Sequence, residues 1–492
     1  MSPELLLQIM LLIPLLGAAG ILFARRNPNV REGVTLVTGA VLFIVVVWLA
    51  NTVSWENAPT LVLAQPFPGL DLALRPEPLG ILFALIASFL WPVTATYAIG
   101  YMRGHGEVNQ TRFYTCFALS ITATLGIAMA ANMLTLFLFY ELLTLATFPL
   151  VTHAGTPEAK RAGRVYLGIL MGTSVALMLL ATIWTFQITG TLEFTRGGIF
   201  PEGTDKTLLS VLLLLFVFGT GKAALMPFHR WLPAAMVAPT PVSALLHAVA
   251  VVKAGVFTVV KVAVYIFGIE TIAELDGARF LSYVAGFTIL AASVIAMGKD
   301  NIKARLAYST ISQLAYIVMG AMIGTSMGIV GSSMHIAMHA FGKITLFFCA
   351  GAILVASHRT KVSELDGIGR RMPFTMAAFT IGALSIIGLP PMGGTWSKWM
   401  LVQGTLDAGA WTLLIVLLVS SLMNISYLLT VPMRAFFARP VIHDDGHTHS
   451  DPNKVKEAPL AMLIAIGITA TGTILLFMFP EGLFTLAQEV AK

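Results

Sequence analysis

Long apolar runs separated by short polar connectors repeat along almost the whole chain of 492 residues. A membrane-spanning helix needs about 20 apolar residues, and runs of that length predict fourteen spans. We expect the spans at roughly 3–23, 33–53, 78–101, 113–131, 132–152, 164–188, 207–227, 241–267, 278–298, 304–323, 325–356, 373–403, 409–433 and 458–479. The pattern predicts an all-α polytopic membrane protein.

Two of these spans contain residues that interrupt a helix. The seventh runs into Pro227, and the twelfth contains GLPPMGG, with Pro390 and Pro391; neither sequence can continue a regular helix. Ordinary proline kinks are one interpretation. However, each break lies in the fourth member of a five-span unit and beside a buried lysine, which favours two inverted five-helix repeats around a transport site, with discontinuous helices 7 and 12.

The chain then divides into four parts. We expect helices 1–3 in residues 1–111, the first repeat (helices 4–8) in 112–268, the second, inverted repeat (helices 9–13) in 277–436, and a cytoplasmic loop with helix 14 in 437–492.

Composition and charge exclude several classes of function. The chain is 57% hydrophobic and 11% charged, which excludes a water-soluble domain of this size. Its two cysteines cannot form a disulfide framework or a four-thiolate zinc or iron–sulfur site, so we expect no redox or hydrolytic site, cofactor or metal in this chain. Twenty Lys and Arg fall on one side of the predicted membrane and five on the other. This asymmetry predicts that both termini lie outside, and it explains the basic charge without nucleic-acid binding.

Six ionisable residues lie at membrane depth, where an isolated charge costs at least ~2.5–3.5 kcal/mol. They are Glu141, Lys222, Lys253, Lys261, Lys343 and Lys398. In low dielectric, a lysine exchanges its proton more readily near neutral pH, so these residues suit a proton relay. Glu141 is the sole buried carboxylate and a natural counter-ion for one lysine, which spacing does not identify. For Lys261, near the outer end of its span, we expect snorkelling to the interface.

Histidines extend this set. His335, His339 and Lys343 are spaced i, i+4 and i+8, on one helical face, which suits a proton wire. A zinc site is not indicated, because the glutamate of HExxH and a third ligand are missing. We interpret His247 as a satisfied core residue and the polar segment 443–451 as a solvated connector.

Several segments together resemble the antiporter-like membrane subunits shared by respiratory complex I, Mrp-type cation/proton antiporters and membrane-bound hydrogenases. They are GTGKAALMPFHRWLPAAMVAPTPVSALLHAVAVVKAGVF (219–257), DNIKARLAYSTISQLAYI (300–317) and GLPPMGGTWSKW (388–399), with Glu141 and the histidine pair. The resemblance covers about residues 78–436 and implies a fourteen-helix fold with two inverted repeats. It also implies roles along a proton path: Glu141 and Lys222 as the buried ion pair of the first half-channel, Lys253 as the connecting lysine, His335 and His339 as the central hydrated axis, and Lys398 as the terminal lysine of the second half-channel.

We therefore expect a proton-translocating subunit of a multisubunit complex in the cell membrane, with other membrane subunits as partners and monovalent cation (Na⁺)/H⁺ antiport as its activity. Lys398, and a chain that ends soon after its fourteenth span, are similar to the D-type subunit of an Mrp antiporter. Residues 238–257 look at least as close to the Mrp A-type or the complex I L-type subunit. The alternatives are a pump subunit of a complex I-like NADH:quinone oxidoreductase or hydrogenase, and a scaffold that has lost conduction. Which parent complex it belongs to, and whether Na⁺, K⁺ or only H⁺ moves, stays open.

Overall fold

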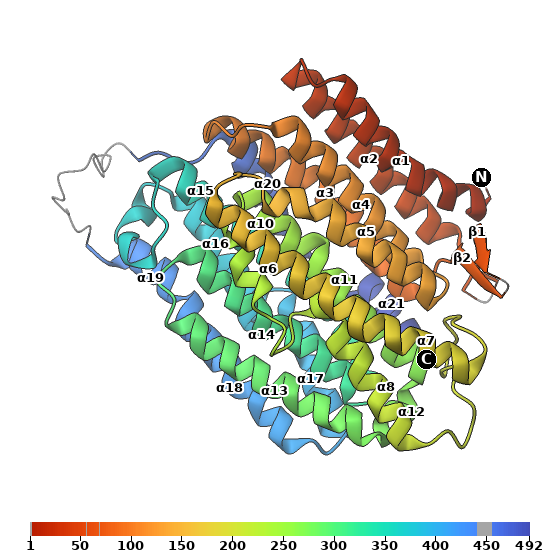
Figure 1. Cartoon of the computed structure of the whole chain (residues 1–492). Coiled ribbons are helices and arrows are strands. Elements are labelled where there is room, and N and C mark those ends of the chain that lie inside the picture. Colours follow the sequence, from red (N-terminus) through yellow and green to blue (C-terminus); the bar gives the residue numbers. More distant parts are fainter. Residues whose placement is uncertain (1, 56, 68, 440–454) are drawn as a thin grey trace.

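The computed structural model describes residues 2–55, 57–67, 69–439 and 455–492, and most of them are helical (Figure 1). The segment 443–451 lies outside the described residues. Eleven helical stretches in the described part are long and apolar enough to cross a membrane. They are α1 (Pro3–Phe23), α2 (Pro28–Thr52), α3 (Pro78–Gly104), α4 (Gln110–Met129), α5 (Met133–Val151), α6 to α7 (Pro157–Thr189), α10 to η5 (Thr240–Phe267), α13 (Asp276–Met297), α15 (Ser326–Ser357), α18 to α19 (Trp411–Phe437) and α20 (Leu460–Met478). The chain is thus a multi-pass integral membrane protein.

Three of these stretches are composites. They consist of α6 (Pro157–Thr173), η1 (Ser174–Met178) and α7 (Leu179–Thr189); α10 (Thr240–Ala244), η4 (Leu245–Val249), α11 (Val251–Val262) and η5 (Ala263–Phe267); and α18 (Trp411–Leu428) and α19 (Thr430–Phe437). The segments η1, η4 and η5 are π-helical. The other helices are α8 (Lys206–Gly219), η2 (Gly221–Ala223), α9 (Trp231–Ala234), η3 (Ala235–Val237), α12 (Ile269–Glu274), α14 (Ile302–Met322), η6 (Val362–Glu364), η7 (Ile368–Arg370), α16 (Pro373–Ile387), α17 (Gly394–Asp407) and α21 (Glu481–Ala491).

Helices end near Pro227 and near the Pro390–Pro391 pair, where the sequence predicts interruptions. Helix α8 ends at Gly219, and the chain continues through the 3₁₀ turn η2 before α9 begins. Helix α16 ends at Ile387, the following Gly388 adopts a φ of +90° that favours glycine, and α17 begins at Gly394. The peptide bonds that precede Pro227 and Pro391 are cis.

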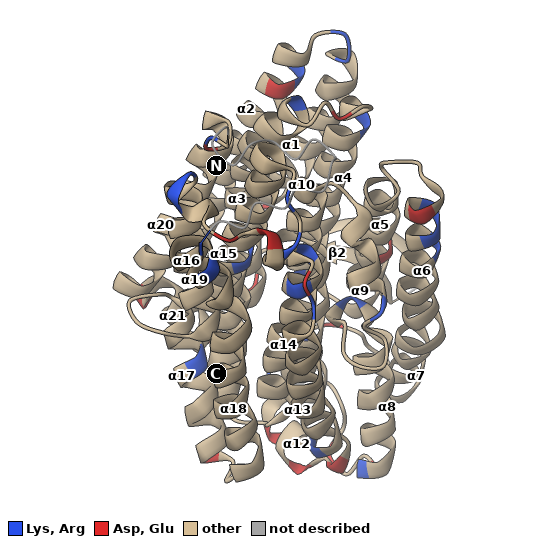
Figure 2. Cartoon of the chain, turned by 90° about the vertical axis from the view of Figure 1, so that its left-hand side faces the viewer, with Lys and Arg blue, Asp and Glu red and all other residues tan. Residues whose placement is uncertain are grey.

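The sequence pattern did not predict the one two-stranded sheet of the described residues. Strands β1 (Leu61–Phe67) and β2 (Leu70–Leu74) pair antiparallel, with Leu61 opposite Leu74. We call the end of the molecule that carries residues 61–74 the hairpin face. Both chain termini lie at this end (Figure 1). Charged residues lie mainly in loops and near helix ends, and the helix bodies are mostly uncharged (Figure 2).

The outer and inner helices differ in how their apolar residues are used. Large apolar side chains such as Leu16, Ile44 and Leu422 are more than half exposed, as expected for helices that face lipid. The stretch from α10 to η5 is fully buried. Its helix α11 packs closely on the first break, because a Cβ built at Gly255 would lie 2.3 Å from the carbonyl carbon of Lys222 and from the nitrogen of Ala223.

This close approach yields a first prediction. Gly255→Ala should push α11 away from η2 and destabilise the protein by about 1–3 kcal/mol, because a methyl group has no space there. Gly168→Ala in α6 is the matched control, since a Cβ at Gly168 would meet nothing within 4 Å. The midpoint of thermal unfolding in detergent measures both. Equal midpoints for the two variants would show that the contact is not tight.

Candidate functional site

The first break holds Lys222 against helix α5. Its ammonium group donates to the carbonyl of Tyr140 at 2.8 Å and to Oγ1 of Thr144 at 2.6 Å, and it lies 3.2 Å from the centre of the Tyr140 ring. Lys222 is completely buried. The backbone around it is also held, because Trp231 donates its indole N–H to the carbonyl of Gly221 at 2.9 Å. Neutral oxygens and an aromatic face therefore supply the contacts of this charge.

Glu141 follows Tyr140 in the sequence of α5 but makes no ion pair with this lysine. No carboxylate of the described residues lies within 4 Å of the Lys222 ammonium nitrogen, and both carboxylate oxygens of Glu141 are buried without a hydrogen-bond partner in the same part of the chain. An unpaired buried carboxylate is costly. This cost falls if the Glu141 carboxylate takes up a proton. It also falls if the Lys222 ammonium moves away from Tyr140 and towards Glu141.

The centre of the molecule joins helices α11, α15 and α17. The Lys253 ammonium nitrogen lies 2.5 Å from Nδ1 of His339, which must accept because an ammonium group can only donate. The rings of His339 and His335 follow with centroids 5.8 Å apart. His335 then contacts Oγ of Ser397 through Nδ1 at 2.8 Å and Oε1 of Gln313 through Nε2 at 3.2 Å. These residues form a line of buried polar groups, in which the two histidine rings face each other without a direct hydrogen bond.

Lys398 lies at the end of this line, next to Ser397 on α17. Its ammonium group donates to the carbonyl of Ile387 at 3.1 Å, at the end of α16, and to Oγ of Ser421 at 3.3 Å. It also lies 4.8 Å from the centre of the Tyr316 ring. The break after Ile387 therefore provides the carbonyl that this lysine uses, because the last carbonyls of a helix have no partner in the helix itself.

Lys343 shares α15 with the two histidines, as expected, but its ammonium group is turned to α14. It donates to Oγ of Ser309 at 2.6 Å and approaches the carbonyl of Leu306 at 3.4 Å. The hydroxyl of Tyr427 donates to the same Ser309 oxygen at 3.0 Å. Lys343 is therefore a branch beside the central line and not a continuation of it.

Two expectations about buried charges are wrong. Lys261 does not reach the interface: it is fully buried and lies 3.1 Å from Oε2 of Glu77. Glu141 is not the sole buried carboxylate, because Glu77 and Glu32 are less than 9% exposed. Glu77 and Glu32 both lie near the ends of helices, which the hydropathy pattern places near water. Spacing gave no signal for Glu77, since its burial depends on how the β2 to α3 segment packs.

His247 is also not a satisfied core residue. It is completely buried in η4, with its ring 4.7 Å from that of Phe347, and neither ring nitrogen has a hydrogen-bond partner among the residues the structure describes. A π-helical turn is not visible in a hydropathy pattern, although such turns are frequent at functional sites.

Comparisons of sequence and of structure both find similar proteins among the membrane subunits of oxidoreductase and antiporter complexes. The family model described as NADH:quinone oxidoreductase/Mrp antiporter, TM, matches residues 130–424. The N subunit of the NADH-quinone oxidoreductase of Desulforudis audaxviator is 31% identical over 486 residues, which cover 96% of this chain and 95% of that protein. The A/B subunit of a probable K⁺/H⁺ antiporter of Rhizobium meliloti is 28% identical, over 96% of this chain and 48% of that protein. A chain of the Mrp complex from Dietzia sp. has the same fold, with a TM-score of 0.86 and 20% identity over 100% of this chain and 97% of that one.

The hydroxyl of Ser309 allows a second prediction. Ser309→Ala removes the acceptor that Lys343 and Tyr427 share. Tyr427 keeps its hydrogen bond to Asn424, but Lys343 keeps only its longer contact with the carbonyl of Leu306. The loss of the short hydrogen bond from a buried ammonium group costs about 1–3 kcal/mol. Ser333→Ala is the control, because Ser333 is equally buried but its hydroxyl has no partner in the described structure. Thermal unfolding should show a lower midpoint for Ser309→Ala alone. A fall of the same size in both variants would contradict this assignment.

Proposed function

Because this chain belongs to the family of NADH:quinone oxidoreductase/Mrp antiporter transmembrane subunits, we propose that it moves protons within a multisubunit membrane complex, as the antiporter-like subunit of a monovalent cation/proton antiporter. The observation that carries this proposal is the buried line from Lys253 through His339 and His335 to Ser397, beside Lys398. Such groups are rare and costly in membranes unless they serve transport.

We propose a route for the proton that follows these contacts. The Lys253 ammonium gives a proton to Nδ1 of His339 along their 2.5 Å contact, and the amine that remains is neutral. His335 exchanges a proton with the hydroxyl of Ser397. The two histidines share no hydrogen bond in the described residues, and neither do Ser397 and Lys398, so water completes the path at both places. Lys222 and Lys253 share no direct bond in the described residues, so water carries the proton between them. From Lys253 to Lys398, each step leaves neutral groups or a cation behind, and this part of the path contains no carboxylate.

Glu141 would set the direction of movement on the Lys222 side. When the ammonium of Lys222 lies against Tyr140 and Thr144, the carboxylate of Glu141 is unpaired. A shift towards Glu141 would pair the two charges and withdraw the proton of Lys222 from the path. The two arrangements differ in charge pairing, which provides a physical means of coupling the proton to a second ion.

The proposal includes fourteen spans in two inverted units. Helix α14 and the broken pairs α8/α9 and α16/α17 would add three spans to the eleven that length and apolar composition support. An internal correspondence supports the repeat: Lys398 follows Lys222, and Tyr316 follows Tyr140, by the same 176 residues, and in both units the ammonium lies over the tyrosine ring. The distribution of basic residues would place both termini, and the hairpin face with them, on the outside.

A redox-driven pump is the second candidate, and a specific observation favours it. The relative of 31% identity, matched over 95% of its length, is named as part of an NADH-quinone oxidoreductase. In that setting, redox partners in other chains would drive the same line of residues. Antiport is supported by the relative that is named as part of a probable K⁺/H⁺ antiporter. Sodium as the second ion remains our expectation within the antiporter proposal.

The third prediction tests proton movement itself. Lys222→Ala should slow proton movement in membrane vesicles by about 100-fold or more, because it removes a proton-exchanging group from the path, while the complex still assembles. Lys206→Ala is the control: Lys206 is exposed on the same span and pairs with Glu274 at 2.8 Å. A pH-sensitive dye reports the rate. Transport by Lys222→Ala at the wild-type rate would refute the relay.

The fourth prediction separates the two candidates. The native complex, purified through this chain, should contain other hydrophobic subunits without flavin or iron–sulfur proteins if it is an antiporter. Mass spectrometry of the subunits and the visible absorption spectrum measure this directly. Stoichiometric flavin- or iron–sulfur-bearing subunits would replace antiport with the redox pump.

A further inference from the structure

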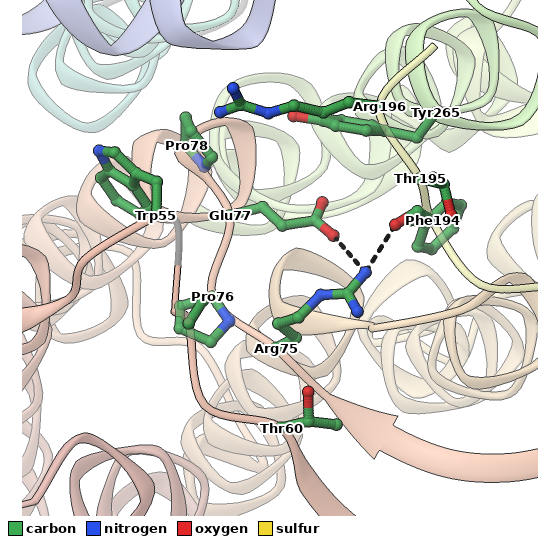
Figure 3. A pocket seen from close by; sticks show the side chains of 11 residues that line it. Trp55, Thr60, Arg75, Pro76, Glu77, Pro78, Phe194, Thr195, Arg196 and Tyr265 are labelled. Carbon is green, nitrogen blue, oxygen red and sulfur yellow. Dashed lines mark hydrogen bonds and ion pairs between the residues drawn. The ribbon is translucent and has the colours of Figure 1, made fainter. Parts of the chain in front are cut away.

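A cavity of about 380 Å³ opens at the hairpin face, away from the line of Lys253 and the histidines (Figure 3). Four segments line it: the α2 to β1 connection, the residues between β2 and α3, the α7 to α8 connection, and η5. The lining residues that matter below are Arg75, Glu77, Thr195, Arg196 and Tyr265.

Behind this cavity lies a buried ion pair that the proposed path does not use. Lys261 is fully buried, and its ammonium lies 3.1 Å from Oε2 of Glu77 and donates to the carbonyl of Ala130 at 2.7 Å. Glu77 lines the cavity and is only 8% exposed. It also directly precedes helix α3, at the end where the helix dipole stabilises a negative charge. The pair therefore joins a buried cation to an open cavity through one carboxylate.

The other charges around the pair are balanced. Arg75 donates to Oε1 of Glu77 at 3.3 Å and to the carbonyl of Phe194 at 2.6 Å, as Figure 3 shows, and lies 3.5 Å from Glu193. Arg196 pairs with Glu489 of α21 at 3.7 Å. Lys261, Arg75 and Arg196 thus face Glu77, Glu193 and Glu489, and Glu489 also pairs with Lys492. Each carboxylate of the cluster is therefore balanced by at least one cation. The proton is the charge that can be exchanged without upsetting this balance.

Tyr265 adds a polar group with no assigned partner. Its side chain is 2% exposed and lines the cavity, and its hydroxyl makes no hydrogen bond within the described residues. A buried hydroxyl without a partner is costly, so a group that donates or accepts hydrogen bonds belongs next to it. Water in the cavity fits this requirement and would reach Glu77 from the hairpin face.

Lys261 also lies on the helix that carries Lys253. The two lysines are eight residues apart on α11, about 12 Å at 1.5 Å per residue. Phe257 lies between them in the sequence, packs at a tilt against Phe83 with ring centroids 5.1 Å apart, and has its ring centre 5.6 Å from the Lys261 ammonium. The ion pair therefore lies further along α11 than the central line, on the side of the cavity that Glu77 lines, and the ring of Phe257 lies close to it.

We propose that Lys261 and Glu77 form a proton-exchange pair that connects the central line to water at the hairpin face. This inference rests on the proposed function. The N–H bond of the Lys261 ammonium breaks, and an O–H bond forms on Oε2 of Glu77, which leaves a neutral amine and a neutral carboxylic acid. Glu77 then releases the proton to water in the cavity, and Lys261 takes a proton from the side of Lys253.

This step is inexpensive for a physical reason. Within a buried ion pair, proton transfer converts two charges into two neutral groups, so neither partner is left as an unpaired ion in low dielectric. Arg75 stays charged throughout, because a guanidinium group does not lose its proton in proteins. It holds Glu77 in place and favours the return of its negative charge.

Lys261→Arg is the decisive variant. An arginine keeps a positive charge for Glu77 but cannot release a proton. Proton movement in membrane vesicles should therefore fall by at least about tenfold, while assembly and thermal stability stay close to those of the wild type. Transport at the wild-type rate by Lys261→Arg would show that the pair only holds helices together and would overturn the proposal.

Glu77 provides a second, independent variant if Lys261→Arg does not assemble. Glu77→Gln should lose transport to the same extent, and Glu77→Asp, which restores a carboxylate, should recover it with a changed dependence on the pH at the hairpin face. The control is Lys206→Arg with Glu274→Gln, an exposed pair on which transport should not depend. Equal pH profiles for the wild type and Glu77→Asp, or full activity of Glu77→Gln, would contradict the proposal.

Access to the cavity can be measured separately. Thr195→Cys should react with a membrane-impermeant maleimide added on the hairpin side, and absence of labelling would contradict a water-filled connection.

The outcome for Lys222→Ala distinguishes this inference from the proposed function. If Lys222→Ala is inactive and Lys261→Arg is fully active, the proton path stands and only the exchange pair fails.

Discussion

A lysine ammonium group in hydrocarbon needs oxygen, nitrogen or aromatic contacts, because its charge is otherwise too costly to bury. In the described part of this chain, four of the five buried lysines take one of those contacts from a backbone carbonyl. The carbonyl acceptors are Tyr140 for Lys222, Ala130 for Lys261, Leu306 for Lys343 and Ile387 for Lys398. A carbonyl offers partial negative charge without adding a second full charge. A lysine held in this way can lose its proton and leave no buried anion behind, which a lysine paired with a carboxylate cannot do unless the carboxylate takes that proton.

The buried lysines therefore differ from one another mainly in whether a carboxylate lies close to the ammonium group. Among the buried lysines of the described chain, Lys261 alone has a carboxylate within ion-pair distance. Glu141 is near Lys222 but unpaired, and the corresponding position beside Tyr316 is Ile317, which cannot ionise. In the proposed two-unit arrangement, both units have a lysine over a tyrosine ring but differ in acid content. Such a difference would give the two ends of the proposed proton path unequal charge pairing, as a path that is coupled to a second process requires.

Hydropathy was enough to locate most helices, because a membrane span is defined by the length of one apolar run. Pro227 and Gly388 likewise revealed the breaks, since backbone geometry is a local property. The site is less predictable where a partner comes from far along the chain. The contact between Lys253 and His339 joins residues 86 apart, and the burial of Glu77 depends on a strand pair that no apolar alternation indicated. Spacing can identify which residues are costly to bury, but packing decides which of them meet.

The geometry of the α10 to η5 stretch shows how packing makes this choice. A π-helical turn contains an additional residue and changes the direction of the side chains that follow it. Two such turns flank α11, and each carries a buried polar ring without a partner in the described residues, His247 in η4 and Tyr265 in η5. Between them, α11 carries Lys253 towards the histidines of α15 and Lys261 towards Glu77. One helix thus presents two lysines to two different polar surroundings, and the π-helical turns at its ends place a further polar ring beyond each lysine. Proton exchange at both ends of α11 would depend on this arrangement, because an uninterrupted α-helix of the same sequence would point His247 and Tyr265 in other directions.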